Sequence, residues 1–271
     1  MEPTAGLDRE AGGPSAGALI DAALARAVVY RTFSTLFQSP TDAGLRQIGA
    51  RDGFPVVAAA WRYLAPPGGE AGVDLQGVEL GPIPVPDLET LESAYVRLFG
   101  HTARGPVPSC ETEYGMDNAF HQPQQLADIS GYYVAFGLGV STASATRVDH
   151  IACELEFMDF LNRKEALLLA TPAPAGTGDE TIEATRQAMR TFLRDHLGRF
   201  GLSFASRLAA EDPDGFFGAL GRWLLAFLER ECARLGIEAG PADLVLRPET
   251  PDDLPVGCGT ADELIQIQRR P

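Results

Sequence analysis

The sequence is short of positive charge. It holds 22 lysine and arginine residues against 37 aspartate and glutamate residues, so its formal net charge is −15 at pH 7. Nucleic-acid binding relies on lysine and arginine to neutralise phosphates, and this composition disfavours that class of protein. The excess of acid suits a basic partner, although a solvated acidic surface is the simpler explanation.

Cysteine is scarce and widely spaced. The four cysteines, Cys110, Cys153, Cys232 and Cys258, form no C-x-x-C pair, so neither a zinc ribbon nor a thioredoxin-like motif is supported. Their scatter is typical of reduced cysteines inside the cell. Residues 1–27 carry no basic segment ahead of an apolar core, and no uncharged run is long enough to span a bilayer. We therefore expect a soluble, cytoplasmic protein.

Motifs of the common enzyme classes are also absent. The sequence has no P-loop, no G-x-G-x-x-G after a strand and no G-x-S-x-G motif. Cys110 is followed by Glu111, whose negative charge disfavours the thiolate that a nucleophilic cysteine needs. No complete active site is visible from the residues alone.

What the sequence does contain is helical periodicity. Apolar residues recur at spacings of three and four, whereas alternation typical of strands and repeats of fixed period are missing. The predicted helices cover residues 19–37, 55–64, 87–99, 122–137, 149–169, 180–200 and 214–235. The last of these is apolar on more than half of its circumference, which places it in the core.

The expected fold class is all-α, with one helical domain over residues 17–235. Residues 1–16 are expected to form a flexible N-terminal segment, and 65–86 a Pro/Gly-rich loop. Residues 236–271 are expected to form a Pro-rich C-terminal arm with one short helix at 260–268. The role of that arm and of its Cys258 stays open.

The stretch TRVDHIACELEFMDFL (146–161) carries the first candidate site. Asp149 is a favoured helix N-cap whose charge suits the helix dipole, and His150 would then be exposed in the first turn. Alternatively, His150 and Glu154 share a helix face and could bind one metal ion. A helical di-metal site needs Glu-x-x-His pairs from two helices, and no second pair is found.

The segment SCETEYG carries the second candidate site. Glu111 and Glu113 could act as paired carboxylates in acid–base catalysis. Neighbouring acids are common in so acidic a chain, so solvated loop charge is the simpler interpretation.

Three stretches together resemble the TorD/DmsD family of molybdoenzyme maturation chaperones. The stretch YVRLFGHTARGPVPSCETEYG (95–115) is similar to the family's Y-x-x-L-F segment and the P-x-Y-E-S-x-Y-like loop after it. QLADISGYYVAFGL (125–138) is similar to its helix–tyrosine–Gly-Leu segment, and 146–161 to its P-D-H-x-x-x-E-L-x-F-M run. Val148 stands where a proline is usual before the Asp-His pair, and Thr112 replaces a serine.

The resemblance implies a TorD-like helical bundle that is not an enzyme and needs no cofactor of its own. Family members bind the twin-arginine leader of a molybdopterin oxidoreductase catalytic subunit, of the DMSO reductase family, in the cytoplasm. They retain that subunit until its cofactor is inserted and thereby proofread its export. Neither the client enzyme, nor a nucleotide ligand, nor the choice between monomer and homodimer follows from the sequence.

The resemblance also suggests a leader-binding surface. Carried over residue by residue, it comprises Asp149, His150, Glu111, Tyr114, Tyr132, Tyr133 and Glu154. Carboxylates can bind arginine bidentately, aromatic faces can stack on guanidinium, and an apolar groove could take the leader's hydrophobic part.

Two other functions are weighed against this one. The first is a helical metal-dependent enzyme that uses His150, Glu154 and the loop carboxylates. The second is a structural subunit that stays with a membrane-associated redox complex.

Overall fold

A computed structural model describes most of the chain. The described residues are 15–52, 54–65, 84–101, 104–116, 121–139, 146–171 and 177–248. The expected short helix at 260–268, Cys258, and most of the N-terminal segment and of the Pro/Gly-rich loop lie outside them.

The described ranges are helical and contain isolated β-bridges but no strand, so the predicted all-α class is confirmed. The α-helices are α1 (Ala16–Leu36), α2 (Asp42–Gln47), α3 (Pro55–Leu64), α4 (Leu88–Phe99), α5 (Gln122–Ala135), α6 (Ile151–Ala170), α7 (Thr177–Phe192), α8 (Gly198–Glu211) and α9 (Phe216–Leu235). Short turns are the 3₁₀ segments η1 (Ala50–Asp52) and η2 (Glu111–Glu113) and the π-helical η4 (Leu193–Leu197). None of these helices is both long enough and apolar enough to cross a membrane.

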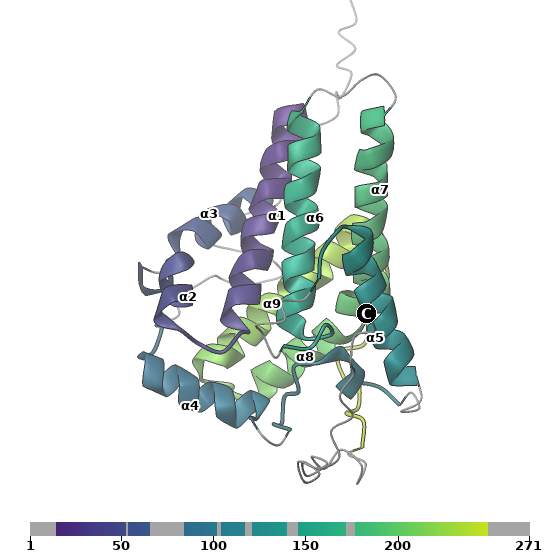
Figure 1. Cartoon of the computed structure of the whole chain (residues 1–271). Helices are drawn as coiled ribbons and strands as arrows, with labels where there is room; N and C mark the ends of the chain where they lie inside the picture. Colours follow the sequence, from purple (N-terminus) through teal and green to yellow (C-terminus); the bar gives the residue numbers. More distant parts are fainter. Residues whose placement is uncertain are drawn as a thin grey trace, which may run out of the picture.

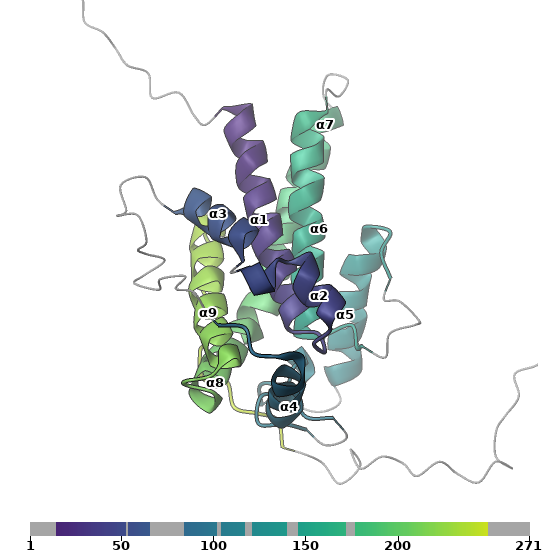
Figure 2. The ribbon, with the colours of Figure 1, turned by 90° about the vertical axis from the view of Figure 1, so that its left-hand side faces the viewer.

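The helices α1 and α6 lie side by side along their length and form the centre of the bundle (Figures 1 and 2). The helix α3 packs on α1, α7 packs on α6, and α8 packs on α9. Aromatic side chains fill the space between them. One group is Phe37, Phe99, Phe204 and Phe217, whose rings meet edge to face or stacked.

A second aromatic group joins α5 to α6 and α7. Phe157 lies between Tyr133 and Phe192, with ring centroids 5.0 and 4.7 Å away. All three side chains are buried. This group fixes α5 against the first half of α6, where the candidate site residues lie.

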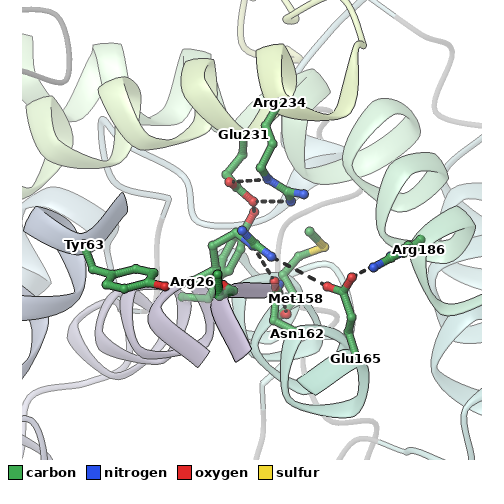
Figure 3. Close-up of polar contacts among 10 residues, drawn as sticks. Arg26, Tyr63, Met158, Asn162, Glu165, Arg186, Glu231 and Arg234 are labelled. Carbon is green, nitrogen blue, oxygen red and sulfur yellow. Dashed lines mark hydrogen bonds and ion pairs between the residues drawn. The ribbon is translucent and has the colours of Figure 1, made fainter. Parts of the chain in front are cut away.

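Buried polar groups also tie the long helices together (Figure 3). Arg26 of α1 donates from Nε to Oδ1 of Asn162 in α6 at 2.9 Å and faces Glu165 at 3.7 Å. Glu165 in turn accepts a 2.6 Å hydrogen bond from Nε of Arg186 in α7. Since buried ions are stable only when paired, these bonds fix the register of α1, α6 and α7.

The same network reaches α9. Arg234 donates from Nε and Nη2 to both carboxylate oxygens of Glu231, at 2.8 and 2.7 Å (Figure 3). The hydroxyl of Tyr30 on α1 donates to Glu231 at 3.2 Å. The long helices therefore meet through charge as well as through apolar packing.

The predicted helix at 180–200 ends in the wrong place. The chain runs through α7, passes the π turn η4 and continues as α8 to Glu211. Gly198 and Gly201 resemble helix breakers in the sequence, but a Cβ on Gly198 would lie 2.4 Å from the carbonyl oxygen of Leu193. Glycine at this position allows the π turn to form within a continuous helical segment.

The first part of the C-terminal arm packs on the helices. The amide of Gly240 donates to the carbonyl of Gly198 at 3.2 Å, and the amide of Arg247 donates to the carbonyl of Glu113 at 2.8 Å. The arm thereby holds the loop that carries Glu111. The division of the chain into three parts stays a prediction.

Candidate functional site

The candidate site forms where the loop at 104–116 meets the start of α6. The amide of Glu111 donates to the carbonyl of Asp149 at 2.9 Å, and the amide of Ile151 donates to the carbonyl of Ser109 at 2.8 Å. Cys110 and His150 are thereby paired in an isolated antiparallel bridge. The SCETEYG loop and the Asp-His pair are therefore one structural unit.

Asp149 holds the loop and does not cap the helix. Its fully buried carboxylate accepts hydrogen bonds from the amide and hydroxyl of Thr112, at 3.1 and 2.8 Å. Arg147 donates to it from Nε and Nη2, at 3.0 and 2.9 Å. The predicted capping role is wrong because these donors lie within reach of Asp149 before α6 begins at Ile151.

The N-cap of α6 is His150. Its Nδ1 accepts a hydrogen bond from the amide of Ala152 at 3.1 Å, which an imidazole can do only when that nitrogen carries no proton. Burial lowers the pKa of His150 to about 4, and the neighbouring Asp149 only partly opposes this shift. His150 is half-buried, whereas the sequence predicted an exposed side chain.

Glu111 and Glu154 form a buried carboxyl pair. Glu111 is 1% exposed and accepts from His196 Nδ1 at 3.1 Å, with Arg199 Nε 3.5 Å away. Glu154 is fully buried, and among the described residues no donor lies within hydrogen-bonding distance of either oxygen. Burial, and then the charge of Glu111, raises the pKa of Glu154 well above its usual value.

Two carboxyl groups that face each other can share a hydrogen bond only when one of them carries a proton. Burial and the charge of Glu111 both favour the protonated form of Glu154, so we assign Glu154 as the neutral acid of this pair. The interpretation of Glu111 as solvated loop charge is wrong, because neither this side chain nor that of Glu154 reaches water.

The metal-binding arrangement considered for His150 and Glu154 does not form. His150 precedes the helix, so the two side chains do not share a helix face, and Nδ1 of His150 is engaged with Ala152. Across the described ranges, no group of three His, Cys, Asp or Glu side chains is placed to hold a metal ion.

The three tyrosines differ in exposure. Tyr114 is fully buried and donates to the carbonyl of Pro108 at 2.8 Å, and Tyr133 donates to the carbonyl of Val148 at 2.9 Å. Tyr132 is half-buried, with its ring edge-on to Phe192 and His196. The structure therefore gathers all seven predicted residues around the loop and the start of α6, but only His150 and Tyr132 are partly exposed.

Four residues that complete the site could not be identified from the sequence. Arg147 and Thr112 bind Asp149, and His196 and Arg199 bind Glu111. Arg147 and Thr112 both lie in the stretches that carried the motifs, but nothing in the sequence pairs them. His196 lies in the π turn, and no local sequence pattern predicts that turn.

A separate cavity lies between α1, α2 and α6. It has a volume of about 620 Å³, and its lining includes apolar Val28 and Ile48 together with Arg31, Arg46 and Arg163. Arginines on its wall make it a poor complement to another arginine-rich segment.

A comparison with protein families gives a match to the nitrate reductase delta subunit over residues 78–206, from before α4 into α8. This range contains the loop, α5, the Asp-His pair and the start of α6. The comparisons with curated proteins and with solved structures gave no match. The match covers just under half of the chain and is consistent with a TorD-type molybdoenzyme maturation chaperone, as the resemblance to the TorD/DmsD family indicated.

Proposed function

We propose that this chaperone binds the twin-arginine leader of its client at the face formed by α5, the 104–116 loop and the start of α6. The client is a molybdopterin oxidoreductase catalytic subunit of the DMSO reductase family. Binding takes place in the cytoplasm, by a monomer or a homodimer, and retains the client until its cofactor is inserted. The observation that carries the proposal is the joining of the motif loop and the Asp-His pair into one unit inside the matched range.

Charge supports a basic ligand. A leader peptide presents two arginines, and the chain's net charge of −15 would speed its encounter with such a peptide. Asp128 on α5 and Glu156 on α6 are exposed carboxylates on the elements that flank the site, and Glu156 already accepts a 2.7 Å hydrogen bond from Arg31 of α1. Such carboxylates can bind guanidinium through two parallel hydrogen bonds.

Exposure divides the predicted residues into two roles. His150 and Tyr132 would contact the leader directly, since both are partly exposed. Val134 on α5 is 70% exposed and provides apolar surface for the leader's hydrophobic segment. The remaining five, Asp149, Glu111, Glu154, Tyr114 and Tyr133, are buried, and in the unbound protein they would hold the loop and helices that shape this surface.

Calorimetric titration with a synthetic twin-arginine leader tests the proposal. His150→Ala and Tyr132→Ala should each weaken binding severalfold while circular dichroism stays nearly unchanged. Tyr63→Ala is the matched control, because Tyr63 is 49% exposed but belongs to α3, outside the matched range. Absence of binding to any twin-arginine leader, with no molybdoenzyme subunit recovered from cells, would refute leader recognition.

A further inference from the structure

We infer that Arg147 occupies a guanidinium-binding subsite, made by Asp149 and Thr112, which an arginine of the client leader takes over on binding. The identity of that ligand rests on the proposed function. The chemistry of the subsite rests on the contacts of the described residues and can be tested by itself.

The contacts of Arg147 have the geometry of arginine recognition. Its Nε and Nη2 donate to Oδ1 and Oδ2 of Asp149 at 3.0 and 2.9 Å, which is a two-bond fork on one carboxylate. Nη2 also donates to the hydroxyl of Thr112 at 2.5 Å. That hydroxyl donates its own proton to Asp149 at 2.8 Å, so its lone pairs are free to accept. The subsite therefore has three acceptor atoms arranged for one planar guanidinium.

Electrostatics favour a cation at this position. The fully buried Asp149 lies close enough to Glu113 and Glu154 to raise the pKa of both carboxyl groups, although burial is the larger cause in each case. Glu111 also faces Glu154. Without Arg147, the subsite would keep the charge of Asp149 and lose the guanidinium that contacts it. A guanidinium is better suited than an ammonium to refill it, because only the former matches the fork.

The arginine that fills the subsite is positioned to leave it. The side chain of Arg147 is 48% exposed while that of Asp149 is not exposed at all, so water can solvate the guanidinium as it departs. Arg147 lies ahead of α6, so its departure breaks no helical hydrogen bond. Asp149 and Thr112 are by contrast held by the backbone bonds between the loop and the start of α6.

If a leader arginine replaces Arg147 in the subsite, Arg147 and the leader must compete for Asp149 and Thr112. Arg147→Gly and Arg147→Gln should bind a twin-arginine leader about tenfold more tightly than the unaltered protein, since one charge-assisted hydrogen bond is worth that much. A twin-lysine version of the peptide should gain much less. Arg163→Gly is the matched control, because Arg163 is a half-exposed arginine on buried Asp159, outside the subsite.

A second measurement tests the subsite without any leader. Millimolar methylguanidinium should raise the melting temperature of Arg147→Gly, and methylammonium should not. The double variant Arg147→Gly/Asp149→Asn should lose this response, and Arg163→Gly should not acquire it. Arg147→Gln serves for the leader titration if the glycine variant folds poorly.

The outcomes separate the two proposals. If the leader binds with equal affinity to the unaltered protein and to both Arg147 variants, the subsite is refuted and leader recognition stands. If no variant binds a leader but methylguanidinium stabilises Arg147→Gly selectively, the subsite stands and the proposed ligand is wrong. An equal response to methylguanidinium and methylammonium overturns the subsite.

Discussion

The replacement Asp149→Ala tests whether this carboxylate holds the loop or caps the helix. In the structure it accepts four hydrogen bonds, two from Thr112 and two from Arg147, and none from the first turn of α6. Alanine would remove every acceptor atom of the side chain and leave the backbone unchanged. The loop at 104–116 should then loosen from the start of α6 while α6 itself remains folded.

The magnitude follows from the exposure of the donors. The amide of Thr112 is in a fully buried residue, and a buried donor left without a partner costs about 1–3 kcal/mol. The hydroxyl of Thr112 can rotate toward another acceptor, so its loss is smaller. Arg147 is 48% exposed and regains water, so the lost ion pair costs less than the buried amide of Thr112 does. We expect a loss of about 2–4 kcal/mol, or about 5–12 °C in melting temperature for a domain of this size.

Urea unfolding followed by circular dichroism measures the loss directly. His150→Ala is the comparison, because it removes the observed cap and should cost about 0.5–2 kcal/mol. Asp149→Asn should fall between the parent protein and Asp149→Ala, since its amide oxygen can still accept from Thr112. A smaller loss for Asp149→Ala than for His150→Ala, accompanied by lower helicity, would refute the loop-holding role.

Three further predictions concern other buried groups. Glu154→Gln should be more stable than the parent at neutral pH. The folded state raises the pKa of Glu154, so the parent loses stability as the pH rises above about 4.5, whereas glutamine does not titrate. In unfolding experiments below that pH, the gain should vanish. His150 has a folded pKa of about 4 against 6.5 unfolded, so its contribution should be lost as pH falls from 6.5 to 4, and His150→Asn should flatten that part of the stability profile. Gly221→Ala should lower the melting temperature, because the new Cβ would lie 2.7 Å from the carbonyl oxygen of Ala205 in α8. Gly131→Ala should raise it slightly, because its new Cβ meets no atom of the described residues within 4 Å.

Helix positions could be predicted from the sequence where apolar spacing and breakers agreed. The helix at 55–64 was predicted with the observed bounds, and Gly100 ends α4 as expected. The short α2 and most of α8 were missed. The predicted helix stopped at residue 200, but in the structure Gly198 and Gly201 both serve close packing: a Cβ on Gly201 would lie 2.8 Å from Leu228.

The candidate site was harder to predict because its partners are distant in the sequence. Glu111 and His196 are separated by 85 positions, and only the folded chain brings them to 3.1 Å. Composition favoured solvent exposure for an acidic loop residue, but buried His196 and half-buried Arg199 supply partners that let Glu111 be buried. Motif resemblance found the right segments, because it depends on the whole loop and does not require each side chain to be assigned.

The exchange of roles between Asp149 and His150 affects how the leader-binding surface can be probed. A local pattern favours aspartate as the cap, yet a capping bond contributes less than the fork of Arg147 together with two bonds from Thr112, so the fold assigns the cap to the imidazole. Loss of leader binding in Asp149→Ala would therefore combine loop release with any lost contact. His150→Asn retains a side-chain acceptor for the cap while removing the ring, and Arg147→Gln leaves Asp149 in place. These two replacements separate recognition from folding at the same site.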